Sequence, residues 1–65
     1  MVVDKGRFEI ALAAQKETIE GLSQKSGLTK KTIHNLRNEK NVAPKTVGVI
    51  AEALRTSVAE LVKMG

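Results

Sequence analysis

The sequence predicts an all-α fold of five short helices in one domain, residues 1–65. Apolar residues recur at spacings of three and four along the chain, which is the spacing of one helix face. Serine, threonine or proline stands near the start of several of these segments, where helices are capped or begin. No segment has the pattern of a β-strand. A chain of 65 residues buries only about 60% of its unfolded surface, so the expected core is small.

The first two helices are expected over residues 5–16 and 18–25. The inward stripe of the first helix repeats at i, i+3 and i+4, and its members are Phe8, Ala11 and Leu12. A second, weaker apolar edge of that helix consists of Ile10 and Ala14. Thr18 is the expected N-cap of the second helix. The residues of the second helix that are expected to face inward are Ile19, Leu22 and Ser23.

A turn of three residues, Ser26, Gly27 and Leu28, separates the second helix from the third. Gly27 is expected to end the second helix, because glycine adopts the left-handed conformation without a Cβ penalty. Thr29 is the expected cap of the third helix, which continues to about Asn38. Two short helices joined in this way predict a helix-turn-helix over residues 18–38.

The third helix has two different faces. At about 100° per residue, its polar side chains fall within an arc of about 140°. These side chains belong to Lys30, Lys31, His34, Asn35 and Asn38. Ile33 and Leu36 point the opposite way. One half of this helix is therefore expected to be buried and the other half presented to a partner.

The fourth helix is expected over residues 45–55, with Pro44 near its start. Its inward stripe consists of Val47, Ile50, Ala51 and Leu54. Gly48 inside this helix costs about 1 kcal/mol relative to alanine, so we expect close helix packing there. Residues 57–60 read SVAE, which is a capping-box pattern that opens a short last helix. The apolar stripe of the last helix consists of Val58, Leu61 and Val62.

The positive charge of the chain is segregated. From residue 25 to residue 45 there are six basic residues and one acid, a local net charge of +5. The other five bases and six acids sum to −1, which accounts for the overall +4. A solvated surface does not require such segregation, whereas a polyanion site does.

Several classes of function are disfavoured by composition. Without cysteine there is no disulfide or thiolate metal site, and a reducing cytoplasm is the expected setting. No apolar run approaches the roughly 20 residues that cross a bilayer, so no membrane partner is expected. His34 has no second ligand at metal spacing. There is no Gly-rich phosphate loop and no recognisable catalytic set, so we expect neither an enzyme nor a cofactor nor a small-molecule ligand.

The motif residues of this chain resemble the lambda-repressor-like family, the phage repressor and Cro type of helix-turn-helix domain. The first part of the match consists of Leu22-Ser23, Gly27, Leu28, Thr29 and Thr32-Ile33. The second part consists of Pro44, Ala51-Glu-Ala-Leu54 and Ser57. The resemblance covers about residues 8–61 and implies a compact five-helix domain.

Three positions depart from the family pattern. The glutamine that commonly contacts phosphate at the start of the second helix is replaced by Ile19. An arginine and a glutamate that often pair between the first and third helices are replaced by Leu12 and Arg37. The glycine that usually follows the third helix is replaced by Glu39. These changes bear on the phosphate contacts of the second helix more than on the fold.

The resemblance implies a sequence-specific regulator of transcription that binds double-stranded DNA, with a repressor as the expected role. The residues expected to read bases are Lys30, Lys31, His34 and Asn35. The residues expected to contact the DNA backbone are Thr18, Thr29, Asn38, Lys40, Asn41 and Lys45. For Lys30, a contact to phosphate alone remains an equal alternative. A symmetric homodimer is expected, and its candidate surface contains Val49, Ala53, Ala59, Val62 and Met64.

Two other interpretations remain open. One is an antitoxin that represses its own operon, although the chain shows no disordered tail to bind a toxin. The other is a protein–protein adaptor that uses the same fold and binds an acidic partner through its basic face. Binding to duplex DNA at rising salt distinguishes the adaptor from a DNA-binding protein.

Overall fold

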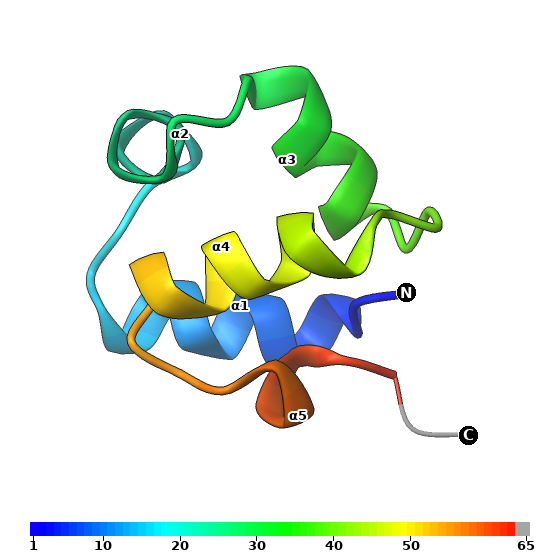
Figure 1. The fold of residues 1–65 in the computed structure, drawn as a ribbon. Helices are drawn as coiled ribbons and strands as arrows, with labels where there is room; N and C mark the ends of the chain where they lie inside the picture. Colours follow the sequence, from blue (N-terminus) through cyan, green and yellow to red (C-terminus); the bar gives the residue numbers. More distant parts are fainter. Residues whose placement is uncertain (64–65) are drawn as a thin grey trace.

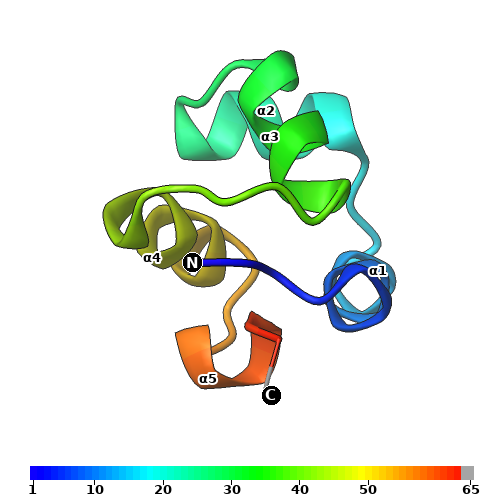
Figure 2. The ribbon, with the colours of Figure 1, turned by 90° about the vertical axis from the view of Figure 1, so that its right-hand side faces the viewer.

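Five helices follow one another along the chain: α1 (Lys5–Ala14), α2 (Ile19–Ser26), α3 (Lys30–Arg37), α4 (Pro44–Ala53) and α5 (Val58–Leu61). This computed structural model describes residues 1–63. In that range no strand is formed, so the expected all-α class is confirmed. The α2 helix packs against α3 and α4, and α5 packs against α1 and α4. In both Figure 1 and Figure 2, α1 and α4 lie between the α2–α3 pair and α5.

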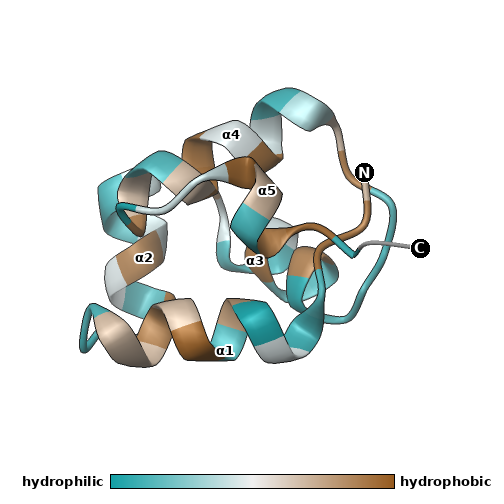
Figure 3. Ribbon diagram, turned by 90° about the horizontal axis from the view of Figure 1, so that it is seen from below, coloured by the Kyte–Doolittle hydropathy of each residue, from teal (hydrophilic) through white to brown (hydrophobic). Residues whose placement is uncertain are grey.

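Apart from Val3, which precedes α1 and belongs to no predicted stripe, the core is built from the apolar stripes that helical spacing predicts. Its members are Val3, Phe8, Leu12, Leu22, Ile33, Leu36, Val47, Ile50, Ala51, Leu54 and Leu61. Figure 3 shows hydrophobic segments in every helix, whereas the loop between α3 and α4 is mainly hydrophilic. The second apolar edge of α1 lies in solvent, because Ile10 is 71% exposed and Ala14 is exposed as well.

Side-chain caps begin four of the helices, and three of these caps are predicted by the sequence. Thr18 Oγ1 accepts a hydrogen bond from the N–H of Gly21 at 3.0 Å, and Thr29 Oγ1 accepts one from Thr32 at 3.2 Å. Ser57 Oγ likewise accepts from the N–H of Glu60 at 3.3 Å. The fourth cap, Asp4, was not among the predicted caps; its Oδ1 accepts from the N–H of Arg7 at 3.0 Å. Each cap satisfies one N–H that the helix itself leaves without a partner.

Left-handed residues follow four of the helices. Gly27 has φ 77°, which confirms the expected end of α2. The residues that follow the other helices are not glycine: Lys16 has φ 52°, Glu39 has φ 61° and Arg55 has φ 54°. A side chain in this conformation is uncommon and requires contacts elsewhere to hold it.

The first residues of the chain join two segments that are distant in the sequence. Val3 forms an isolated antiparallel bridge with Val62, and the N–H of Lys63 donates to the carbonyl of Val2 at 2.9 Å. The N–H of Val42 donates to the carbonyl of Met1 at 2.8 Å. This segment therefore connects the loop after α3 to the end of α5. Local patterns along the chain do not predict it, because every contact is long-range.

The prediction that helices pack closely at Gly48 is wrong. A Cβ built at Gly48 would meet no heavy atom within 4 Å. The glycine therefore does not permit a close approach between helices. It sits inside α4 with the usual entropic disadvantage of glycine in a helix and no compensating contact among the described residues.

Gly48→Ala is therefore expected to stabilise the protein by about 0.5–1 kcal/mol. Alanine restricts the unfolded chain more than glycine does, and here it has room in the folded state. Urea unfolding followed by circular dichroism measures the change. Gly27→Ala is the matched control and should destabilise, since its φ of 77° disfavours any side chain. A loss of stability in Gly48→Ala would mean that an unseen partner surface covers this position.

Candidate nucleic-acid interface

The turn between α2 and α3 is held by serine side chains at the end of α2. Ser23 Oγ donates to the carbonyl of Leu28 at 2.6 Å, and Ser26 Oγ accepts from the N–H of Leu28 at 3.2 Å. The Leu28 side chain packs against the core. Both backbone groups of Leu28 are thus satisfied within the turn, and this fixes the path of the chain into α3.

The two faces of α3 lie as the sequence predicts. Ile33 and Leu36 are 0% exposed and anchor the helix from behind. Of the residues expected to read bases, Lys30, Lys31 and His34 are exposed, and Asn35 is half-buried. The outward half of the helix is therefore available to a partner, with Asn35 at its edge.

The expected backbone contacts fall into two groups, one at the N-terminal ends of α2 and α3 and one at and beyond the C-terminal end of α3. Thr18 and Thr29 cap α2 and α3, so their hydroxyls already accept hydrogen bonds from the backbone. The N–H groups of Lys30 and Lys31 take part in none of the hydrogen bonds found for residues 1–63 and are open to an anion. The second group, at and beyond the C-terminal end of α3, contains the exposed residues Asn38, Lys40, Asn41 and Lys45. The Asn41 Oδ1 accepts from the amino group of Met1 at 2.6 Å.

A carboxylate occupies the N-terminal end of α2, a contact that local sequence patterns do not predict. Glu17 Oε1 accepts from the N–H of Thr18 at 3.2 Å, and Oε2 lies 2.8 Å from Lys25 Nζ. The Lys25 hydrogen bond, followed by the Thr18 hydrogen bond, lowers the pKa of Glu17 below its usual value. A Cβ at Gly21 would clash with Glu17 Oε1, so the glycine leaves room for this carboxylate. An anion of the protein therefore already lies where Thr18 was expected to meet phosphate.

Arg37 at the end of α3 forms an ion pair with α1 that local sequence patterns do not predict. Its Nε lies 2.6 Å from Glu9 Oε1, in a partly buried contact. The family pairing that Leu12 and Arg37 replace is thus restored with the charges reversed, one turn earlier on α1. The contact ties the C-terminal end of α3 to α1 and orients the helix from its inner edge.

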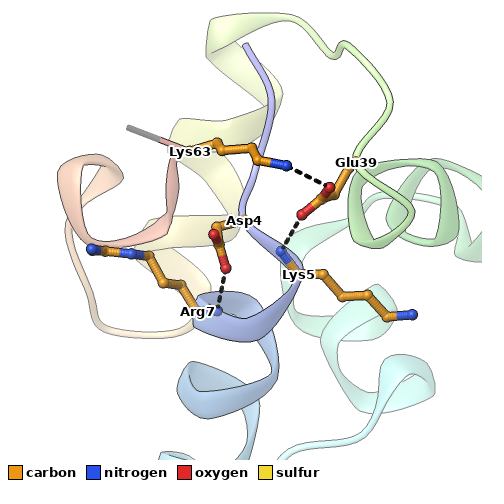
Figure 4. A network of polar contacts seen from close by, with 5 residues as sticks. All are labelled: Asp4, Lys5, Arg7, Glu39 and Lys63. Carbon is orange, nitrogen blue, oxygen red and sulfur yellow. Dashed lines mark hydrogen bonds and ion pairs between the residues drawn. The ribbon is translucent and has the colours of Figure 1, made fainter. Parts of the chain in front are cut away.

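Glu39 connects three segments next to the loop that follows α3 (Figure 4). Its Oε2 accepts from the backbone N–H of Lys5 at 3.1 Å, and its Oε1 lies 2.9 Å from Lys63 Nζ. These contacts hold Glu39 in its left-handed conformation and fix the start of the loop that carries Lys40. The Lys5 hydrogen bond, followed by the Lys63 hydrogen bond, lowers the pKa of Glu39. The same pairing raises the pKa of Lys63.

The stability of the protein is expected to fall in acid in a way that depends on Glu39. A carboxyl whose pKa is lower in the folded state stabilises the fold above its unfolded pKa and loses that effect as the pH falls through the folded value. For Glu39 this loss begins near the ordinary glutamate pKa of about 4.3 and extends over the acid range below it, because the folded-state pKa is lowered. Glu39→Gln should therefore show a lower melting temperature at neutral pH and a shallower decline over that range. Melting curves of both proteins measure this, with Glu52→Gln on α4 as the control for removing one charge.

The residues expected at a dimer surface come from α4 and from the C-terminal end of the sequence. Val49 and Ala53 are half-buried and line an open hollow between α2 and α4, together with Lys25, Ser26 and Glu52. Of the other candidates, Ala59 is exposed, Val62 is half-buried at its bridge to Val3, and Met64 lies outside the described residues.

Over residues 1–63, no helix has both the length and the apolar character that a membrane crossing requires. The same part of the chain holds no group of three or more His, Cys, Asp or Glu side chains placed to bind a metal ion.

Two helices joined by a tight turn, with the second half-buried and basic on its outer side, define a helix-turn-helix protein. Residues 7–64 match the family model of the Cro/C1-type HTH DNA-binding domain. The chain therefore belongs to the Cro/C1-type family of DNA-binding domains, and the resemblance inferred from its motif residues is confirmed. Neither the curated proteins nor the solved structures gave a match.

Proposed function

We propose that this protein is a sequence-specific transcriptional repressor that lays α3 in the major groove of double-stranded DNA. The observation that carries the proposal is the outward, basic half of α3, with Ile33 and Leu36 buried behind it. In helix-turn-helix proteins the N-terminal residues of the second helix contact base edges, while the first helix crosses the DNA backbone. The membership of a DNA-binding family supports the same geometry.

Within this proposal, Lys31 and Asn35 read base edges. Lysine donates to O6 and N7 of guanine, and asparagine pairs with N6 and N7 of adenine. Lys30 and His34 are shared between bases and backbone. The residues that contact the DNA backbone are Thr18, Thr29, Asn38, Lys40, Asn41 and Lys45. Because the Glu17 carboxylate lies at the start of α2, α3 and the loop after it supply more of the phosphate contacts in this proposal than α2 does.

The proposed active species is a symmetric homodimer. A single α3 reads only a few base pairs, whereas two helices about 34 Å apart on one face of the duplex read two half-sites. Discrimination against the many non-specific sites of a genome requires this larger footprint. A symmetric protein of this kind selects an operator with matching two-fold symmetry.

The test is selection of bound fragments from a random duplex library, followed by gel shifts of the winner at rising salt. A palindromic winner supports both the sequence preference and the dimer. The logarithm of affinity should fall with the logarithm of salt by about 0.9 per phosphate contact. A reporter gene placed behind the selected site then separates repression from activation. Failure to shift any duplex at low salt would overturn the proposal and favour a protein–protein adaptor.

A further inference from the structure

Glu20 and Lys30 form an exposed ion pair between the first turns of α2 and α3. Glu20 Oε1 lies 3.7 Å from Lys30 Nζ, and the two side chains are 69% and 58% exposed respectively. Glu20 stands in the first turn of α2, and Lys30 is the first residue of α3. In the proposed DNA complex these turns are the parts of the motif that reach the backbone and the groove.

The fold does not need this ion pair. Exposed ion pairs contribute little to stability, because water and salt screen them. For non-specific DNA binding the carboxylate is a disadvantage, since it repels phosphates and offsets the positive charge of Lys30. A basic interface that only neutralised phosphates would therefore bind more tightly without Glu20.

The pair presents a cationic donor and an anionic acceptor next to each other. A G·C base pair presents the complementary set in the major groove: N7 and O6 of guanine accept hydrogen bonds, and the N4 amino group of cytosine donates one. A carboxylate is the side-chain group that accepts from cytosine N4, and an ammonium donates to guanine. A phosphate, by contrast, matches the ammonium alone.

We propose that Glu20 is a specificity-determining residue that reads one G·C base pair together with Lys30. Lys30 donates to guanine O6 or N7, and Glu20 accepts from cytosine N4 while it holds the ammonium away from phosphates. This inference rests on the proposed docking of α3 in the major groove. It assigns Lys30 to a base contact. From the sequence, a base contact and a phosphate contact were equal alternatives for this residue.

The test compares Glu20→Ala with Glu52→Ala, using the duplex selected by the wild-type protein and copies in which each G·C pair is changed to A·T. Glu52 is an exposed carboxylate of α4 that forms no ion pair with any residue from 1 to 63, so its variant controls for the lost charge. Alanine favours the helix at both positions. Melting curves check that each variant is folded.

At one G·C position the wild-type protein should prefer the original pair by about 5- to 150-fold. Glu20→Ala should lose most of that ratio at this position alone. It should also bind random duplex more tightly, with a salt slope steeper by about 0.9, because Lys30 becomes free to contact a phosphate. Glu52→Ala should keep the wild-type ratio at every position.

Three results would overturn the inference. A wild-type base preference in Glu20→Ala would overturn it while leaving the proposed function intact. An equal loss of base preference in Glu52→Ala would show that the preference depends only on the net charge of the protein. A wild-type protein that shifts no duplex would overturn the proposed function, and this inference with it.

Discussion

Ile33→Ala is expected to remove most of the stability of the domain. Ile33 is 0% exposed and belongs to the core on which α3 rests. Truncation of a buried isoleucine to alanine costs about 2–5 kcal/mol, because it removes apolar contacts and leaves a cavity. A 65-residue domain has a total stability of about 3–10 kcal/mol. Urea unfolding followed by circular dichroism should show a much lower midpoint, and DNA affinity at 37 °C should fall in parallel.

Ile10→Ala is the matched control, because it deletes the same atoms from a surface position. Ile10 is 71% exposed on α1, so the free energy of unfolding should change by no more than about 0.5 kcal/mol. Equal destabilisation by the two substitutions would contradict the packing of α3 described above. It would also indicate that the exposed edge of α1 is covered by a second copy or another partner in solution.

The core could be predicted from the sequence because helical periodicity decides it locally. Val47, Ile50 and Leu54 recur at the spacing of one helix face, and all three are buried. The same local logic applies to the caps Thr18 and Thr29, since a cap side chain acts within its own first turn. Exposure of the polar half of α3 follows from the same periodicity, although its contacts with DNA remain predictions.

The parts that could not be predicted depend on contacts between distant segments. Glu39 departs from the family glycine, and nothing near it in the sequence shows that Lys5 and Lys63 hold its left-handed backbone. The contact between Glu9 and Arg37 joins α1 to α3, and it also requires the tertiary fold. The prediction of close helix packing at Gly48 was wrong for a related reason. Glycine in a helix is compatible with close packing but does not cause it.

Electrostatic roles were the least predictable feature of the site. Glu17 and Glu20 are two glutamates three residues apart, and nothing in the local sequence distinguishes their roles. In the structure Glu17 is bound at the start of α2 by Thr18 and Lys25, whereas Glu20 reaches across to Lys30. The two roles differ because the turn at Gly27 sets the position of α3 relative to α2. The sequence spacing of Glu17 and Glu20 does not predict that position.

Asn35→Ala and Lys40→Ala are expected to weaken DNA binding in two different ways. Asn35 lies at the edge of the outward half of α3, so its loss should cost about 1–3 kcal/mol at one base position and relax the preference there. Lys40 lies exposed in the loop after α3, and in the proposed complex it contacts the DNA backbone. Its loss should weaken binding to all sequences alike and reduce the salt slope by about 1.

The comparison separates base reading from phosphate contact because each variant is the control for the other. Gel shifts with the selected duplex, with single-base variants of it and with random duplex give both quantities for each protein. Alanine favours the helix at position 35, so a folding defect is not the expected cause of any loss there. Equal weakening of every duplex by both substitutions would show that Asn35 does not read a base. Sequence selection would then rest on Lys31, or on Glu20 together with Lys30.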